Sequence, residues 1–126
     1  KKVIGVEVVE DAIKDAKENV KLNGIKNADF FQGDLNNFFK KNHKIIQKNK
    51  PDVIIVDPPR AGLHKNTIDT IIKYTSCKIV YVSCNPSTQA RDLVILNDAG
   101  YRIANIQPLD MFPHTPHIEN IVTLIK

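Results

Sequence analysis

A cysteine stands directly behind an apolar run in the second half of the chain. The run Val80-Tyr81-Val82-Ser83 leads into Cys84, and Asn85-Pro86 follows it. Proline suits the first turn of a helix, and a helix N-terminus favours the nucleophilic thiolate form of a cysteine. Ligands bind outside the carboxyl ends of parallel strands, so a thiol there is placed to react. By position alone, Cys84 can equally be an inert small hydrophobic residue.

Two further segments supply charged groups that suit covalent chemistry. The apolar run 53–56 ends in Asp57-Pro58-Pro59-Arg60, and its two prolines fix φ and make a rigid ledge. Glu119 lies in the apolar segment 112–120, where a carboxylate can act as a proton acceptor. The alternatives are a stiff capped turn at 57–60 and a surface acid at 119. Together, a nucleophile, a cation and a proton acceptor predict a covalent mechanism.

Two acids follow expected strands in the first third of the chain. Glu7 closes the run 3–8, where a carboxylate can accept hydrogen bonds from both ribose hydroxyls of a nucleoside cofactor. Asp34 follows the run 28–32 and can accept from an adenine amino group or cap the next helix. For Glu7, a solvent-facing acid at the end of a strand is the alternative interpretation.

Metal binding is disfavoured by the types and spacing of the candidate ligands. His114 and His117 have i,i+3 spacing, but no carboxylate or thiol set completes a zinc site. Contact with RNA or ordering of their loop is the preferred interpretation of both. Cys77 and Cys84 form no disulfide framework, which favours a reducing, cytosolic setting. Cys77 is expected to be only a connector between a helix and a strand.

Strand and helix patterns alternate along the chain. Three apolar runs are continuous, as expected when both faces of a sheet are covered. The order predicts a doubly wound, Rossmann-like α/β domain whose last two strands are antiparallel. Strands are expected at residues 3–8, 28–32, 53–56, 79–83, 103–108 and 118–125, and helices at 12–22 (capped by Asp11), 35–47, 65–74 and 86–99.

Composition limits the classes of protein that fit. The chain has 126 residues, 42% of them hydrophobic and 25% charged, which is typical of one soluble domain or part of one. No apolar run reaches the length of a membrane span, about 20 residues. The formal charge of +4 is compatible with a polyanionic partner such as RNA. No glycine-rich cofactor turn precedes Glu7, so the chain is expected to be a piece that begins after that turn.

Three linked motifs resemble the RNA (uracil-5-)-methyltransferase family. They are DPPRAGL at 57–63, SCNPSTQARDL at 83–93 and DMFPHTPHIENI at 110–121. Their order and spacing match the C-terminal catalytic domain of that family, and the likeness covers essentially the whole chain. It is greatest to the bacterial branch that acts on 23S ribosomal RNA, although the transfer RNA branch shares most of the pattern.

The resemblance implies roles for individual residues. Cys84 matches the family's nucleophile and Glu119 its general base, while the acids at 7, 34 and 57 (Glu7, Asp34 and Asp57) match positions that bind S-adenosylmethionine. Residues 1–126 are then the C-terminal part of a methyltransferase domain of a cytoplasmic enzyme, and are expected to be inactive alone. In the chemistry that this implies, Arg60 and Asn85 are candidates to support the uracil base or its enolate oxygen.

Other functions are weighed against this one. Arg60 stands where an aromatic residue would suit a flipped adenine and a cysteine would suit a cytosine carbon-5 enzyme, which argues against both. A non-catalytic RNA-binding or assembly module is compatible with the basic charge. In the family's arrangement an absent strand would leave the strands at 3–8 and 53–56 with open edges. These edges are expected to pair directly or to recruit another copy, which predicts self-association.

Overall fold

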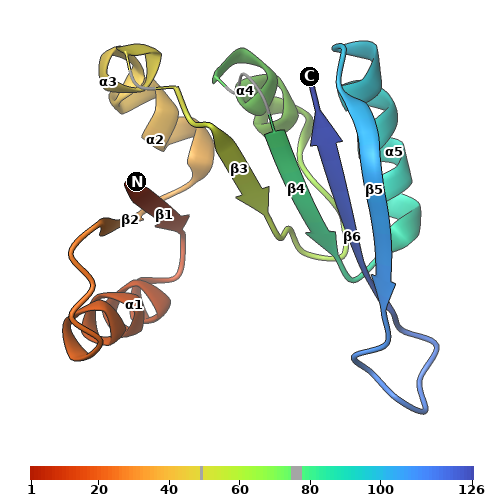
Figure 1. Ribbon diagram of the computed structural model, residues 1–126, viewed down its shortest axis with the longest axis horizontal. Coiled ribbons are helices and arrows are strands. Elements are labelled where there is room, and N and C mark those ends of the chain that lie inside the picture. Colours follow the sequence, from red (N-terminus) through yellow and green to blue (C-terminus); the bar gives the residue numbers. More distant parts are fainter. Residues whose placement is uncertain (49, 75–77) are drawn as a thin grey trace. The chain divides into compact units, whose positions relative to one another are not determined.

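The computed structural model describes residues 1–48, 50–74 and 78–126 (Figure 1). They form two compact regions, Lys1–Lys44 and Ile45–Lys126, and each is described by itself. In chain order the elements are β1 (Val3–Glu7), α1 (Glu10–Leu22), β2 (Ala28–Gln32), α2 (Leu35–Lys41), α3 (His43–Lys48), β3 (Val53–Val56), α4 (Lys65–Tyr74), β4 (Lys78–Ser83), α5 (Pro86–Asp98), β5 (Arg102–Leu109) and β6 (Glu119–Ile125).

The first region is built on a parallel pair of strands. β1 and β2 pair from Val3 opposite Ala28 to Glu7 opposite Gln32, and α1 connects them. Gly5 lies so close to the ring of Phe30 that a Cβ atom there would be 2.5 Å from it. The small residue thus lets the Phe30 ring pack directly on the backbone of β1.

The start of α1 differs from the sequence prediction. Asp11 was expected to cap the helix, but the cap residue is Val9 and Asp11 lies in the first turn. The Val9 side chain makes no capping hydrogen bond, and the backbone N–H of Val9 itself donates to Oε1 of Glu7 at 2.9 Å. The predicted end is confirmed, since Gly24 follows the helix with φ of 61°.

The single helix expected at 35–47 is two helices, α2 and α3. Asn42 separates them, and its backbone N–H and its side-chain amide both donate to the carbonyl of Phe38, at 3.0 and 2.9 Å. This side chain competes with the next helical turn, as asparagine often does. Within the expected apolar face Phe39 and Ile46 are buried, whereas the side chain of Ile45 lies outside the described part.

The second region is a four-stranded mixed sheet in the order β3-β4-β6-β5 (Figure 1). β3 and β4 are parallel, and β6 is antiparallel to both β4 and β5, which confirms the predicted closing pair. α4 begins and ends where the sequence predicted, and the region between α4 and β4 that includes Cys77 lies outside the described residues. The fully buried apolar core consists of Ile68, Ile71, Ile79, Tyr81, Leu96, Tyr101, Val122 and Leu124.

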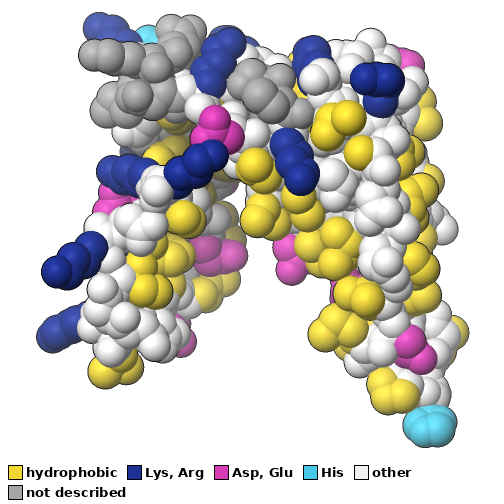
Figure 2. Space-filling model, in the orientation of Figure 1, with side chains coloured by type: hydrophobic (Ala, Val, Ile, Leu, Met, Phe, Trp, Pro, Cys, Tyr) yellow, Lys and Arg dark blue, Asp and Glu magenta, His cyan; other side chains and the backbone are white. Residues whose placement is uncertain are grey.

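The expectation that the apolar strands are covered on both faces is wrong for β3. Val53 and Ile55 are 45% and 72% exposed, and they alternate with half-buried residues. β4 lies inside the sheet and has buried residues at Ile79, Tyr81 and Ser83. Hydrophobic side chains are accordingly visible on the surface of the four-stranded sheet (Figure 2). A continuous apolar run therefore does not by itself show that both faces of a strand are covered.

Among the described strands, β1 and β3 each lie at the edge of a sheet and have one strand partner. These are the edges that the sequence predicted to pair or to recruit another copy. β1 is hydrogen-bonded to β2, and β3 is hydrogen-bonded to β4. Among the described helices, none combines the length and apolar character needed to cross a bilayer.

Candidate functional site

Cys84 lies at the junction between β4 and α5 in the second region. β4 ends at Ser83, whose hydroxyl accepts a hydrogen bond from the backbone N–H of Asn85 at 3.0 Å. Asn85 is the cap residue of α5, and its side chain accepts from the N–H of Ser87 at 3.2 Å. The Cys84 thiol is free and partly exposed at this helix start. The sequence prediction of a strand, a cysteine and a helix N-terminus is therefore met in the backbone.

Glu119 begins β6 at the same end of the sheet. The β4–β6 ladder finishes with Ser83 opposite Asn120, so Cys84 and Glu119 are the next residues of the two strands. The side-chain amide of Gln89 locks this corner by donating to the carbonyls of Tyr81 at 2.9 Å and Asn120 at 3.2 Å. Its oxygen accepts from the Asn120 amide at 2.6 Å. Cys84, directly after β4, and Glu119, at the start of β6, thus lie at the ends of two neighbouring strands that are tied together.

The turn that carries Asp57 and Arg60 is fastened to α5 through its backbone. The carbonyl of Arg60 accepts from the Asn85 side-chain amide at 3.1 Å and from the Thr88 hydroxyl at 3.0 Å. The side chain of Asp57 is exposed after the end of β3. Asn85, the residue next to Cys84, thereby links the proline-rich turn to the end of β4.

The guanidinium of Arg60 reaches the segment between β5 and β6. Its Nη1 lies 3.3 Å from Nδ1 of His117, and both residues are exposed. The His117 ring meets the ring of Phe112 edge-on, with centroids 6.4 Å apart. Backbone strain is concentrated at His114, which has φ of 65°. The second and third sequence motifs are therefore in direct contact with the first.

A buried carboxylate that sequence reasoning did not single out holds this corner together. Asp92 on α5 is fully buried, and its Oδ2 accepts from the hydroxyl of Tyr81 and from the N–H of Leu63, both at 2.7 Å. Its Oδ1 accepts from Nε and Nη2 of Arg91 at 2.9 and 2.7 Å. Burial, together with the hydrogen bond to Asp92, raises the pKa of Tyr81 well above its usual range. The sequence carried one signal for Asp92: its spacing places it on the same helical face as Gln89 and Leu96. In the structure all three side chains are buried.

Glu7 and Asp34 lie together at one end of the first region. Glu7 is the last residue of β1 and Asp34 follows the neighbouring parallel β2, and the N–H of Gly33 donates to the carbonyl of Glu7 at 2.9 Å. Glu7 is exposed and uses Oε1 for the Val9 N–H. The carboxylate of Asp34 caps α2 by accepting from the Asn37 N–H at 3.0 Å, which confirms the capping interpretation.

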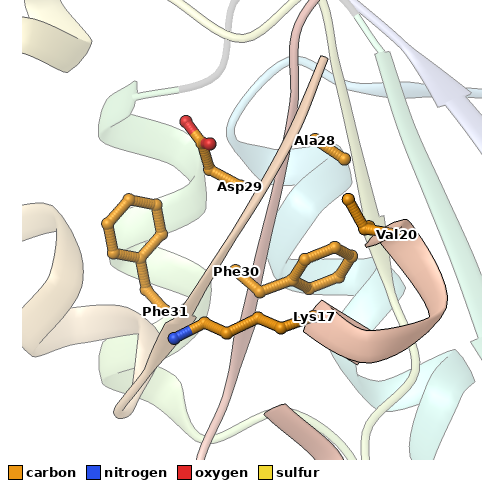
Figure 3. A pocket seen from close by; sticks show the side chains of 6 residues that line it. All are labelled: Lys17, Val20, Ala28, Asp29, Phe30 and Phe31. Atoms are coloured by element: carbon orange, nitrogen blue, oxygen red, sulfur yellow. The ribbon is translucent and has the colours of Figure 1, made fainter. Parts of the chain in front are cut away.

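No predicted site residue lines the pocket in the first region. This pocket has a volume of about 380 Å³ and lies between α1 and β2 (Figure 3). Among the described residues, no three His, Cys, Asp and Glu side chains gather as metal ligands do. The candidate chemistry therefore lies at the strand ends. The pocket is lined by Lys17, Val20, Ala28, Asp29, Phe30 and Phe31.

Comparison with solved structures defines the fold class as that of an α/β methyltransferase. The NSun6 protein of Pyrococcus horikoshii, solved with SFG, is only 16% identical but superposes with a TM-score of 0.73 over 99% of this chain and 41% of that chain. Precorrin-6y C5,15-methyltransferase of Geobacter metallireducens is 14% identical and gives a TM-score of 0.72 over 99% of this chain and 67% of that chain. At these identities the likeness concerns the fold alone.

The chain belongs to the tRNA (uracil-5-)-methyltransferase family, whose model matches residues 1–126. The tRNA (uracil-54, C5)-methyltransferase of Pyrococcus abyssi, solved with S-adenosyl-L-homocysteine, is 40% identical with a TM-score of 0.79 over 98% of this chain and 28% of that chain. An uncharacterized RNA methyltransferase of Bacteroides thetaiotaomicron is 52% identical over 98% of this chain. The chain spans 27% of the length of that relative.

Proposed function

We propose that the protein transfers a methyl group from S-adenosylmethionine to carbon 5 of a uridine in RNA. The observation that carries the proposal is the arrangement at one sheet end, where β4 leads into Cys84 and the adjacent β6 begins at Glu119. Membership of a uracil-5-methyltransferase family supports the same reaction. Carbon 5 of uracil is a poor nucleophile, so the ring has to be activated before it can accept a methyl group.

Cys84 supplies that activation as a covalent nucleophile. Its thiolate adds to carbon 6 of the ring, and the electron pair of the 5,6 double bond moves into an enolate. Carbon 5 of this enolate is then nucleophilic. Cys84 is free and partly exposed two residues before the start of α5 at Pro86, so its sulfur is accessible for this addition.

Glu119 completes the reaction as the general base. After methylation, its carboxylate removes the proton from carbon 5, and the electrons of that bond restore the 5,6 double bond as the Cys84 thiolate leaves. The β4–β6 ladder ends with Ser83 opposite Asn120, so Cys84 and Glu119 each lie one residue beyond that last pair. This neighbourhood supports the proposal that the two groups act on adjacent atoms of one ring.

Arg60 and Asn85 are proposed to support the base and its enolate oxygen. Both are tied to the Cys84 corner, since the Asn85 amide donates to the Arg60 carbonyl at 3.1 Å. A guanidinium is an always-charged donor that suits a developing oxyanion. The target base has to leave its stack to reach the thiol, at a cost of a few kcal/mol, so looped or single-stranded RNA is the favoured substrate.

S-adenosylmethionine supplies an electrophilic methyl group when bound. Glu7 fits the role of a ribose ligand, because it is exposed at a strand end and only its Oε1 is engaged by Val9. Asp57 is likewise exposed at a strand end. Asp34 fits less simply, because its carboxylate already caps α2. We propose all three as cofactor-binding residues.

The test of the proposed function uses the complete gene product and unmodified RNA. Mass analysis of the nucleosides should reveal 5-methyluridine for the wild type and none for Cys84→Ala. Cys77→Ala, the same change at the other cysteine, is the control and should keep normal activity. Methylated cytidine or adenosine as the product would favour the other nucleobase methyltransferases. Persistent uridine methylation by Cys84→Ala would rule out the covalent mechanism.

Glu119→Gln separates the roles of the two residues. This variant should still form the Cys84–RNA adduct but release it slowly, because the carbon-5 proton has no acceptor. General base catalysis is worth typically about 10²–10⁴-fold, so turnover should fall by that factor while the adduct accumulates on denaturing gels. Glu18→Gln, at an exposed acid of α1, is the matched control. Rapid turnover without adduct would contradict the role of Glu119.

The choice of RNA and the state of assembly are also proposals. Ribosomal RNA, and 23S RNA in particular, is the predicted substrate, with transfer RNA as the alternative. Purified RNA fractions offered separately with labelled S-adenosylmethionine distinguish the two. Self-association through the edges of β1 and β3 would appear in sedimentation as a mass above that of the monomer. RNA binding with no methyl transfer to any fraction would instead support a non-catalytic module.

A further inference from the structure

We propose that Asp92 is a positioning residue for the methyl-transfer reaction, because it fixes the 60–63 turn against α5 and thereby sets where Arg60 stands beside Asn85. The proposal rests on the proposed function and adds to it a residue that makes no contact with RNA or cofactor. Asp92 is fully buried on α5 and lies outside the set of residues that carry the chemistry.

The helix binds the turn at successive backbone positions. The carbonyl of Arg60 accepts from Thr88 at 3.0 Å, the carbonyl of Ala61 accepts from Nη2 of Arg91 at 3.0 Å, and the N–H of Leu63 donates to Asp92 at 2.7 Å. Every one of these partners on α5 is a side chain, and every one on the turn is a backbone atom. The turn is thus held in place whatever its own side chains do.

Asp92 occupies the centre of this arrangement. One of its oxygens holds the turn and Tyr81 of β4, while the other holds the Arg91 guanidinium that reaches Ala61. A buried carboxylate with four donors leaves little freedom to the groups around it. Asp92 therefore connects three elements, namely β4 before Cys84, α5 after it, and the turn that carries Arg60.

Gly62 shows how closely the turn approaches α5. It has φ of 80°, and a Cβ atom there would lie 2.7 Å from Oδ2 of Asp92 and 2.8 Å from Nη2 of Arg91. The backbone of the turn therefore lies against the two side chains with no room for a methyl group. Such contact transmits a small shift of Asp92 directly to the turn.

Asp92→Asn tests the proposal in the complete gene product. Asparagine keeps the volume but has one oxygen, so an NH₂ group has to face either Arg91 or the Leu63 N–H. We expect kcat to fall by at least tenfold, measured well below the melting temperature of the variant, with a change of less than threefold in KM for RNA. On RNA containing 5-fluorouridine the adduct persists, because carbon 5 carries no removable proton, and its rate of formation should be lower for Asp92→Asn in the same proportion as kcat. Asp98→Asn, at an exposed acid of the same helix, is the control and should match the wild type.

A double-mutant cycle with Arg60→Ala separates positioning from general damage. If Asp92 acts through Arg60, Asp92→Asn should lower kcat by less than twofold in the Arg60→Ala background. Multiplicative losses, or a kcat for Asp92→Asn within twofold of the wild type, would overturn the proposal. If Asp92→Asn does not fold, Thr88→Val removes one fastening of the turn and enters the same cycle, with an expected loss of two- to fivefold. Absence of methyl transfer by the wild type would instead defeat the proposed function, and with it this role.

Discussion

The two regions hold their candidate site residues in different ways. In Lys1–Lys44, Glu7 and Asp34 are exposed or part-exposed and are fixed by hydrogen bonds to backbone groups within three residues of themselves. In Ile45–Lys126, the corner around Cys84 is fixed by buried side chains that bond to distant parts of the chain, since Asp92 accepts from Leu63 and Gln89 bonds to Asn120. The first arrangement suits residues that bind a ligand, and the second suits residues that must be held at a fixed distance.

The two regions also differ in the number of hydrophobic residues that they bury, and the second region buries more. Ile13 and Phe39 are the buried hydrophobic residues of the described first region, whereas the second region has eight fully buried ones. Val3 and Ile4 of β1 are 54% and 48% exposed. Since local stability follows buried apolar contacts, the second region is expected to be the more resistant to local opening.

A matched pair of glycine substitutions tests how tightly each region is packed. Gly62 and Gly24 both have positive φ, but a Cβ atom at Gly24 would meet nothing within 4 Å. Gly24→Ala should cost about 1–2 kcal/mol from the left-handed backbone alone. Gly62→Ala should cost about 2–5 kcal/mol, because overpacking against Asp92 adds to the same backbone cost. Chemical denaturation measures both, and equal losses would remove this distinction between the regions.

Hydrogen exchange measures the local stability of each strand and so compares the two regions directly. Amides of β4 should exchange on the order of 100-fold more slowly than amides of β1, since β4 is paired on both sides and β1 on one among the described strands. NMR or mass spectrometry of the protein in deuterated buffer provides the rates. Similar protection in the two strands would show that the sparse core around β1 does not lower its stability.

A pH titration of stability should report on the buried corner around Tyr81. The raised pKa of Tyr81 means that the folded protein keeps a proton which the unfolded chain releases above its ordinary pKa, about 10. The contribution of Tyr81 to the free energy of unfolding is therefore fully present below pH 10. It falls as the pH rises above 10, by up to about 1.4 kcal/mol per pH unit. Tyr81→Phe should remove this component of the slope. An unchanged slope in that variant would show that other groups cause the loss.

Sequence reasoning recovered the elements whose signals are local. The strand runs, the extent of α4, the stop at Gly24 and the cap at Asp34 all follow from neighbouring residues. The cap of α1 was misassigned because the helix begins at Glu10, before Asp11, after a cap residue whose side chain makes no capping hydrogen bond. The break at Asn42 depends on which hydrogen bond its side chain makes.

Non-local packing was the harder part to predict. The helical face that Asp92 shares with Gln89 and Leu96 is a weak local signal, because its burial depends on Tyr81 and on the turn that ends at Leu63. The exposure of Ile55 likewise depends on what packs beside β3, which cannot be predicted from its apolar neighbours in the sequence. The motifs did indicate which strand ends come together, since each follows an apolar run.

The paired amides of Gln89 and Asn120 make the corner sensitive to chemical ageing. Gln89 directs its NH₂ group toward two carbonyls, so its oxygen has to face the NH₂ group of Asn120, and neither amide can rotate end for end. Conversion of Asn120 to aspartate by slow hydrolysis would put two acceptors in opposition, one residue from Glu119. If the proposed function holds, stored protein in which mass spectrometry detects that conversion should lose methyl transfer before it loses its fold.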